Sequence, residues 1–198
     1  MTQNPDKNGN NIVRIAITGG IGSGKSHVCH LLEVRGYRVY DCDAAAKRLM
    51  TQSAELRAEI SRLIGPDAYD GDSLNKQRIA AFLMQSEQNA ARLNAVVHPA
   101  VFSDFLQSGI GWVESAILYE SGLWQYVDHA VCVAAPLETR ISRVMERDAI
   151  SREKVLEWMA RQLPQEDVAA RADFIIVNDG IQPLEPQIDH LLETFVHQ

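Results

Sequence analysis

The sequence lacks the features that define several protein classes. No apolar run approaches the roughly 20 residues that a helix needs to cross a bilayer, so no membrane partner is expected. The three cysteines, Cys29, Cys42 and Cys132, have no metal-site spacing, which favours free thiols in a reducing compartment. The first ten residues are polar and contain no apolar signal segment, so we interpret them as a frayed tail and expect a cytoplasmic protein.

Basic residues are few, and they are unevenly distributed. The net charge of −7 argues against non-specific binding to nucleic acid, and no such partner is expected. No Lys or Arg lies between Leu93 and Thr139, whereas a cluster of arginines follows. Its members are Arg140, Arg143, Arg147, Arg152, Arg161 and Arg171. The cluster fits either a surface that binds anions or a solvated helix face paired with glutamates, and the pattern leaves both interpretations open.

The order of apolar patterns predicts an α/β fold. Short runs, most of them rich in β-branched residues, predict core strands at 12–18, 37–40, 112–119, 129–134 and 174–177. Helical patterns separate these strands, which is typical of a parallel sheet covered on both faces. Further helices are predicted over 137–147, 151–162 and 186–198. The stretch 44–109 is helical apart from breaks at 65–66 and 70–72, and it is too long for a simple crossover, so we expect an inserted helical subdomain.

One motif carries the chemistry. Residues 19–26 (GGIGSGKS) fit G-x-x-x-x-G-K-[ST] at every fixed position and lie between a predicted strand and a predicted helix. Such a loop aims successive N–H groups and the positive end of the helix at a phosphate. Lys25 can reach the β- and γ-phosphates of ATP, and Ser26 can place its hydroxyl on Mg²⁺. The expected ATP-binding residues of the motif are Gly20, Ile21, Gly22, Ser23, Gly24, Lys25 and Ser26.

Two carboxylates follow the second predicted strand, at Asp41 and Asp43. Ligands of open α/β sheets bind beyond the carboxyl ends of the strands, so both are expected near the phosphates. One can accept the proton of an attacking hydroxyl, and the other can hold Mg²⁺ through water. Asp43 is also a candidate N-cap for a helix starting at Ala44, which is compatible with a chemical role.

Two nucleotide-binding patterns are absent. The N-K-x-D pattern of GTPases has its nearest match at 75–78 (NKQR), which ends in the wrong residue. No aspartate closes the apolar run WVESAIL, although Glu120 follows it shortly. These absences count against a GTPase switch or a motor ATPase and favour a small kinase that closes an arginine-bearing lid over ATP. A nucleoside, nucleotide or shikimate kinase, or a nucleotide-dependent switch, remain alternatives.

At this point the sequence resembles the dephospho-CoA kinase family. The matching segments are 18–26, 41–43, 93–99, 147–148 with 151–153, 162–164 and 172–180, in the family's order and spacing. The resemblance implies transfer of the γ-phosphoryl group of ATP, with Mg²⁺, to the ribose 3′-hydroxyl of dephospho-CoA. The two small-molecule substrates are then the expected partners.

The resemblance also implies roles for single residues. His27 completes the ATP-phosphate segment, Asp43 is the catalytic base, and Arg147 is a catalytic, phosphate-binding residue at the edge of the lid. His98 matches a family histidine in the substrate subdomain, although Pro99 could simply mark the start of a helix there. Asp41 and Glu120 are further candidates for contacts with the acceptor, and Asp41 also for the metal. His27, Cys42 and Ala116 depart from the usual Thr, Ala and Pro of the family.

The predicted architecture is an α/β P-loop kinase core with a parallel five-stranded sheet flanked by helices, plus an inserted helical substrate subdomain and a helical lid. The core is expected to comprise 12–43, 112–139 and 172–198. The helical acceptor subdomain is expected over 44–111 and the lid over 140–171.

Overall fold

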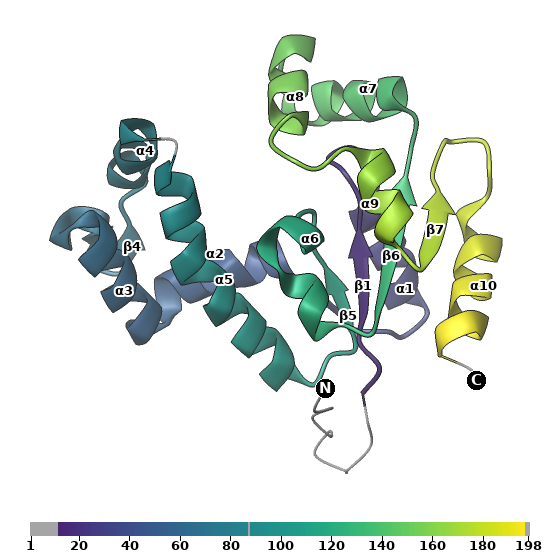
Figure 1. The fold of residues 1–198 in the computed structure, drawn as a ribbon, viewed down its shortest axis with the longest axis horizontal. Coiled ribbons are helices and arrows are strands. Elements are labelled where there is room, and N and C mark those ends of the chain that lie inside the picture. Colours follow the sequence, from purple (N-terminus) through teal and green to yellow (C-terminus); the bar gives the residue numbers. More distant parts are fainter. Residues whose placement is uncertain (1–11, 87, 197–198) are drawn as a thin grey trace. The chain divides into compact units, whose positions relative to one another are not determined.

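The computed structural model describes residues 12–86 and 88–196, so the predicted N-terminal tail lies outside the described residues. The chain forms two compact units (Figure 1). The first comprises the chain up to Tyr40 and again from Gly109 onward, and the second is Asp41–Ser108. The boundaries of the second unit lie three residues before those expected for the helical subdomain. The functions assigned to the core, subdomain and lid stay predictions.

A five-stranded sheet forms the centre of the first unit. Its strands are β1 (Ile15–Thr18), β2 (Val39–Asp41), β5 (Trp112–Glu114), β6 (His129–Ala134) and β7 (Phe174–Val177), in the order β2-β5-β1-β6-β7. β1 pairs with β5 and β6 in parallel, as does β6 with β7. The predicted parallel sheet of five strands is confirmed. After β1 the chain forms β2 and β5 on one side of it and then β6 and β7 on the other. Ligands of such sheets bind beyond the carboxyl ends of the strands where the order reverses, so a ligand site is expected beyond the end of β1.

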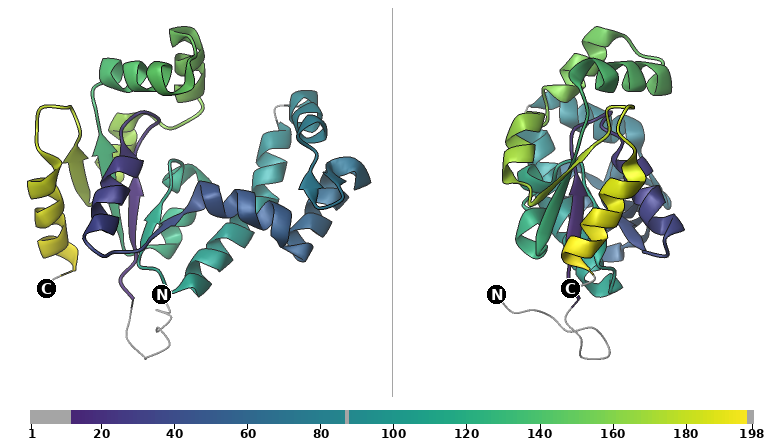
Figure 2. Two further views of the ribbon diagram at one scale, coloured as in Figure 1. Left: turned by 180° about the vertical axis from the view of Figure 1, so that it is seen from behind. Right: turned by 90° about the vertical axis from the view of Figure 1, so that its right-hand side faces the viewer.

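Helices cover both faces of this sheet. Helices α1 (Lys25–Val34) and α10 (Leu184–Phe195) lie on one face, and α6 (Leu118–Ser121) and α9 (Gln165–Arg171) on the other (Figures 1 and 2). The short 3₁₀ helix η2 (Leu123–Tyr126) follows α6. The core beneath α1 and α10 contains side chains at most 1% exposed: Ile15, Ile17, Val28, Leu32, Val131, Val133, Ile176, Ile188 and Leu191. Each such burial contributes about 1.5–3 kcal/mol, which fixes the strand ends that carry the site.

The third core strand is shorter than the sequence predicts. β5 ends at Glu114, and the chain turns into α6, in which Leu118 is fully buried. The predicted strand over 112–119 is therefore wrong beyond Glu114. A short apolar run buries its side chains equally well from a strand or from a helix, and periodicity does not separate the two.

Helices α7 (Leu137–Asp148) and α8 (Arg152–Met159) are joined by a short turn and pack against each other, and the pair is called here the α7–α8 hairpin. Its turn contains Ala149 at φ 51°, a left-handed conformation more usual for glycine. Ile141, Val144 and Val155 are buried between the two helices. The helix predicted over 151–162 ends at Met159, three residues earlier than expected.

The second unit is helical. It contains α2 (Cys42–Gln52), α3 (Ala54–Ile64), the 3₁₀ helix η1 (Pro66–Ala68), α4 (Lys76–Gln85) and α5 (Gln88–Ser108), and α5 packs against the other three α-helices. β3 (Tyr69–Asp70) and β4 (Ser73–Leu74) form a small antiparallel hairpin that the sequence analysis did not predict. Its turn is Gly71-Asp72, at the break noted in the helical pattern, and strands of two residues are too short for a pattern of their own.

Pro99 lies inside α5 and does not begin a helix, so that alternative explanation for the His98-Pro99 pair is wrong. Proline has no N–H to donate to the carbonyl of Ala95 one turn earlier. Pro99 and Ala95 are both exposed, so water can reach the Ala95 carbonyl. This access lowers the free-energy cost of the missing helical hydrogen bond.

Candidate active site

The loop between β1 and α1 is shaped by its glycines. Gly22 and Gly24 have φ of 79° and 93°. A Cβ at Gly22 would overlap the carbonyl oxygen of Arg140, and one at Gly24 would overlap the side-chain nitrogen of Asn178. Glycine is therefore required here for backbone conformation and for space. The loop curls against α7 and against the end of β7, and it presents the N-terminus of α1.

Lys25 is the first residue of α1, and it is buried with a relative exposure of 9%. Its Nζ donates a hydrogen bond to the carbonyl oxygen of Gly20 at 3.3 Å. The lysine chain therefore folds back over the loop. A buried ammonium is stabilised by anionic partners, so this arrangement suits a bound phosphate.

Ser26 contacts a carboxylate that the sequence analysis missed. Its Oγ donates a hydrogen bond to Glu114 Oε1 at 2.8 Å. Glu114 is the last residue of β5, directly beside β1 in the sheet. The sequence does contain a signal for a carboxylate at a strand end, because Glu114 directly follows the apolar pair Trp112-Val113. The strand predicted over 112–119 was too long, so Glu120 was the candidate at its end instead.

Glu114 also faces Cys29. Burial, then the charge of Glu114 and a hydrogen bond to it, raise the pKa of the Cys29 thiol far above its usual range. The thiol is therefore protonated and inert as a nucleophile. No disulfide joins Cys29, Cys42 and Cys132, as the sequence predicts.

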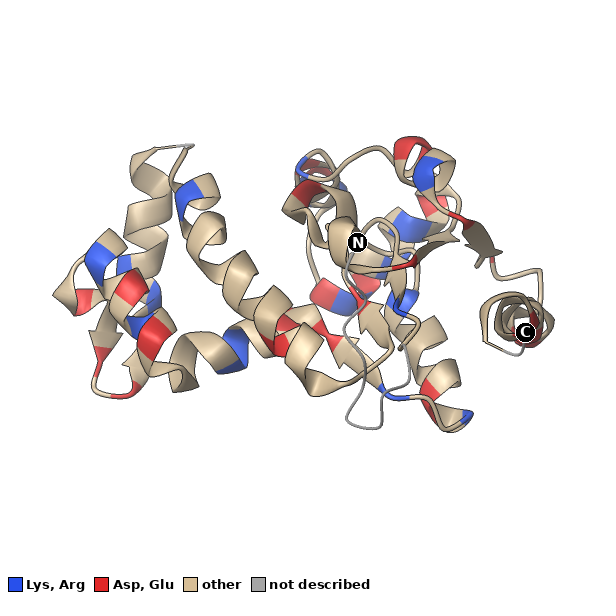
Figure 3. Cartoon of the chain, turned by 60° about the horizontal axis from the view of Figure 1, so that its bottom comes forward, with Lys and Arg blue, Asp and Glu red and all other residues tan. Residues whose placement is uncertain are grey.

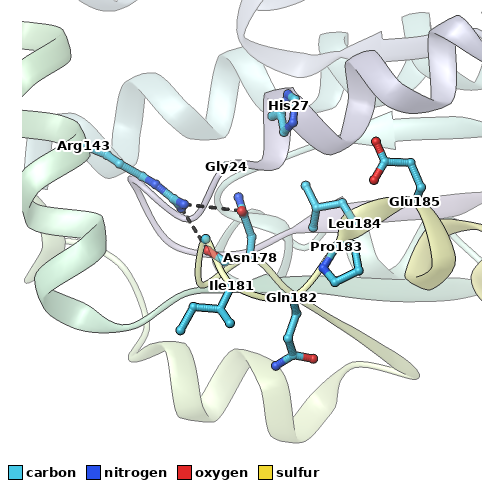
Figure 4. Close-up of a pocket in the computed structure, with 10 residues that line it drawn as sticks. Gly24, His27, Arg143, Asn178, Ile181, Gln182, Pro183, Leu184 and Glu185 are labelled. Atoms are coloured by element: carbon cyan, nitrogen blue, oxygen red, sulfur yellow. Dashed lines mark hydrogen bonds between the residues drawn. The ribbon is translucent and has the colours of Figure 1, made fainter.

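A pocket of about 570 Å³ opens beside Gly24. Its lining residues are Gly24, His27, Arg143, Asn178, Gly180, Ile181, Gln182, Pro183, Leu184 and Glu185 (Figure 4). Arg143 donates to the backbone oxygen of Asn178 at 3.1 Å and to its Oδ1 at 3.3 Å. Asn178 in turn donates to the backbone oxygen of Ser23 at 2.8 Å. The loop after β7, α7 and the phosphate loop thus share one wall, and the volume is that of a small-molecule site.

The arginine cluster divides into two groups. Arg140 is buried and donates from Nε to the backbone oxygen of Ile21 at 3.0 Å, and Arg143 lines the pocket. Burial lowers the pKa of Arg140, but a guanidinium remains charged. These two residues touch the phosphate loop, whereas the family resemblance implied a role for Arg147.

The remaining arginines of α7 and α8 pair with acids. Arg147 donates to both carboxylate oxygens of Asp148 at 2.9 and 2.7 Å, and this hydrogen bonding raises the pKa of Arg147. Arg152 pairs with Glu138 at 2.7 Å. Figure 3 shows acidic and basic positions interspersed over the helices of both units. The interpretation as a solvated face paired with acids therefore holds for Arg147 and Arg152, whereas anion binding by Arg140 and Arg143 stays a prediction.

Gln162 and Glu120 lie at the base of the α7–α8 hairpin. Gln162 Oε1 accepts a hydrogen bond from the N–H of Ile21 at 2.9 Å, and its Nε2 donates to the backbone oxygen of Ala116 at 3.3 Å. Glu120 Oε1 accepts from the N–H of Leu163 at 2.8 Å. The contact of Glu120 with an acceptor stays a prediction.

Three predicted site residues belong to the second unit. Asp41 caps α2, because its Oδ1 accepts from the N–H of Ala44 at 2.9 Å. The prediction that Asp43 is the cap is wrong: Asp43 lies in the first turn, whereas Asp41 has the extended backbone of a cap residue. The carboxylate of Asp43 is thereby left for another role. His98 stacks on Phe102 with ring centroids 5.9 Å apart, and burial lowers the pKa of His98.

The second unit has a groove of its own, of about 460 Å³, on α3 and α5. It is lined by Glu59, Arg62, Leu63, Arg92, Ala95 and Val96. Apolar side chains with two guanidinium groups suit a ligand that has both neutral and anionic parts.

The sequence model of the family described as dephospho-CoA kinase matches residues 13–183. The chain belongs to the dephospho-CoA kinase family. A dephospho-CoA kinase from Bacteroides fragilis (strain YCH46) is 42% identical over 193 residues, which cover 94% of each chain. The crystal structure of TT1252 from Thermus thermophilus has a TM-score of 0.80 at 33% identity and covers 93% of this chain and 97% of that one. A dephospho-CoA kinase from Campylobacter jejuni has a TM-score of 0.65, and at 18% identity it shows the fold alone, over 92% of this chain and 96% of that one.

Membership of the dephospho-CoA kinase family confirms the predicted family, the P-loop kinase fold and the assignment to the transferases. It decides against the other small kinases and against a switch, because the match runs through the phosphate loop, the second unit and the α7–α8 hairpin. Among the described residues, no helix has the length and apolar character needed to cross a membrane.

Proposed function

We propose that the protein transfers the γ-phosphoryl group of ATP to the ribose 3′-hydroxyl of dephospho-CoA, giving CoA and ADP in the last step of CoA synthesis. The observation that carries the proposal is the phosphate loop with the buried Lys25, in a chain of the dephospho-CoA kinase family. The triphosphate lies along residues 20–27, at the N-terminus of α1, where the N–H groups and the helix dipole favour anions.

The nucleoside of ATP occupies the pocket beside Gly24 in this proposal. The pocket is continuous with the phosphate loop through Gly24 and His27. The planar guanidinium of Arg143 can stack on a base, and the backbone of residues 180–182 offers polar groups to its edge. His27 lines the pocket in place of the family's usual Thr, and because its side chain is exposed it can turn toward solvent and leave space for the nucleotide.

The residues at the loop fit Mg²⁺, which would neutralise phosphate charge during transfer. Ser26 and Glu114 supply hard oxygen donors, as Mg²⁺ prefers. Ser26 would be a ligand and Glu114 would act through water, as hydroxyl and carboxylate do in P-loop enzymes. Within residues 12–86 and 88–196, no group of three or more His, Cys, Asp or Glu could hold a metal. A hydrated Mg²⁺ that relies on phosphate oxygens is consistent with so sparse a protein site.

The transfer step needs a base, a charge clamp and a dry site. The 3′-oxygen of the acceptor bonds to the γ-phosphorus, the bond from that phosphorus to the β,γ-bridging oxygen breaks, and Asp43 takes the hydroxyl proton. Lys25 neutralises charge on the transferred group, and Arg147 does so when residues 140–171 close as a lid. Closure also excludes the water that would otherwise hydrolyse ATP.

The acceptor binds the helical unit in this proposal. Residues 44–111 include His98, and the groove with Arg62 and Arg92 suits the diphosphate and pantetheine parts of dephospho-CoA. Asp41 and Glu120 complete the acceptor contacts.

A panel of acceptors tests this function. ADP release is followed with dephospho-CoA, shikimate, nucleosides and nucleotides, each at saturating ATP and Mg²⁺. We expect ADP only with dephospho-CoA. Equal turnover with another acceptor, or ADP release that no acceptor changes, would contradict the proposal.

A further inference from the structure

The tip of the phosphate loop is held from three directions at Ile21. Its N–H donates to Gln162 Oε1 at 2.9 Å, and its carbonyl oxygen accepts from Arg140 Nε at 3.0 Å. Its side chain packs against the apolar cluster of the α7–α8 hairpin, formed by Ile141, Val144 and Val155. The α7–α8 hairpin and Gln162, which follows it, therefore hold the loop by both the backbone and the side chain of Ile21.

Gln162 extends this connection to a second segment. While Oε1 holds Ile21, Nε2 donates to the backbone oxygen of Ala116 at 3.3 Å, in the turn after β5. The next N–H, from Leu163, donates to Glu120 on α6. The backbone of Gln162 is anchored to the end of α8, because its N–H donates to the backbone oxygen of Met159 at 3.1 Å. One side chain thus joins the end of the hairpin, the phosphate loop and the segment leading to α6.

We propose that Gln162 is a positioning residue that couples the α7–α8 hairpin to the phosphate loop through Ile21. A movement of the hairpin must either carry Ile21 with it or break a hydrogen bond to a partly buried N–H. The coupling therefore aligns the loop with the closed hairpin when ATP is bound. This inference rests on the proposed function, because that function places ATP on the loop.

The chain provides a matched control. Gln165, three residues further on in α9, also makes two side-chain hydrogen bonds to backbone groups, here both of Ala135: Oε1 accepts from the Ala135 N–H, and Nε2 donates to the Ala135 carbonyl oxygen, both at 3.1 Å. Gln165 makes the same number of side-chain hydrogen bonds without holding the phosphate loop. If Gln162 has only a structural role, substitution of Gln162 and of Gln165 should give the same result.

The experiment compares Gln162→Met with Gln165→Met. Each keeps the length of the side chain and removes two hydrogen bonds. Melting temperature, calorimetric Kd for a non-hydrolysable ATP analogue with Mg²⁺, and the ratio of ADP to CoA formed are measured. We expect Gln162→Met to weaken analogue binding by at least about fivefold and to raise the product ratio above that of the wild type, because a misaligned site admits water. Gln165→Met should stay within about twofold of the wild type in both, whatever its melting temperature.

The proposal is overturned if the two variants have the same effect on analogue Kd, or if Gln162→Met binds the analogue as the wild type does. If Gln162→Met does not fold, the same binding comparison is made with Ile21→Ala, which removes the apolar contact of Ile21 with the α7–α8 hairpin. The binding measurement uses no acceptor. A wrong acceptor assignment would appear separately, as a wild type that binds the analogue but does not turn over dephospho-CoA.

Discussion

The hydroxyl of Ser26 lies 2.8 Å from Glu114 Oε1, joining the first turn of α1 to the end of β5 across 88 residues of sequence. It brings a hydroxyl and a carboxylate together at the N-terminus of α1, where the proposed function places the triphosphate and Mg²⁺. The pair forms because β1 and β5 are neighbours in the sheet and both end at the same edge.

Glu114→Gln should lower activity by about 10–100-fold and raise the Mg²⁺ concentration needed for half-maximal rate. The amide keeps a hydrogen-bonding partner for Ser26 but removes the charge that holds hydrated Mg²⁺. The measurement is the initial rate across a Mg²⁺ titration. Glu138→Gln, which removes an exposed carboxylate paired with Arg152, is the control. A Glu114→Gln enzyme that matches this control would reduce Glu114 to a structural anchor.

Asp43→Asn should lower kcat by about 10²–10⁴-fold with little change in either KM, because an amide cannot accept the proton of the attacking hydroxyl. Asp41→Asn is the comparison, since asparagine still caps α2 and the fold is preserved. Steady-state kinetics with both substrates varied give the answer. A crippled Asp41→Asn beside a mild Asp43→Asn would show that the two roles are reversed.

His98→Ala should raise the KM for dephospho-CoA and leave the KM for ATP nearly unchanged, because His98 belongs to the unit proposed to bind the acceptor. Burial lowers the pKa of His98, so the side chain is neutral at pH 7 and above, and its contribution should not vary between pH 7 and 8. His30→Ala, at an exposed position on α1, controls for the loss of an imidazole. An effect confined to the KM for ATP would contradict the proposal that residues 44–111 bind the acceptor.

Arg147→Lys should remain damaging to kcat although it keeps the positive charge, because a guanidinium can bridge two phosphate oxygens and an ammonium cannot. Arg147 is 62% exposed and pairs with Asp148, and such a pair contributes at most about 1 kcal/mol to stability. The comparison is kcat of the wild type, Arg147→Lys and Arg147→Ala at saturating substrates. Three kcat values within a few-fold of one another would show that Arg147 does not act in the transfer. The role of neutralising phosphate charge would then pass to Arg140 and Arg143, which already contact the loop.

Local signals made the core predictable from sequence. The glycines of residues 19–26, with a β-branched run before them and a helical pattern after, specify a phosphate loop. The strands at 129–134 and 174–177 were placed correctly, because each is a short apolar run bounded by polar or helical segments. The family resemblance rested on segments spread over the whole chain, and the family match confirms it.

The rest depends on contacts that no local pattern encodes. Glu114 meets Ser26 only because the sheet order sets β5 beside β1. Arg140 and Arg143 reach the loop because α7 starts where β6 ends, one strand from the loop, and their spacing alone does not separate them from Arg147. Asp41 replaced Asp43 as the cap because α2 begins two residues earlier than the predicted start at Ala44.

The most direct test follows the label of [γ-³²P]ATP with dephospho-CoA, using the wild type and Lys25→Ala. The wild type should place the label on CoA, one phosphoryl group for each ADP formed. Lys25→Ala should transfer almost none while melting near the wild-type temperature, because we propose that Lys25 binds phosphate, and it does not belong to the hydrophobic core. Label found only in inorganic phosphate, or equal transfer by a folded Lys25→Ala enzyme, would contradict the account.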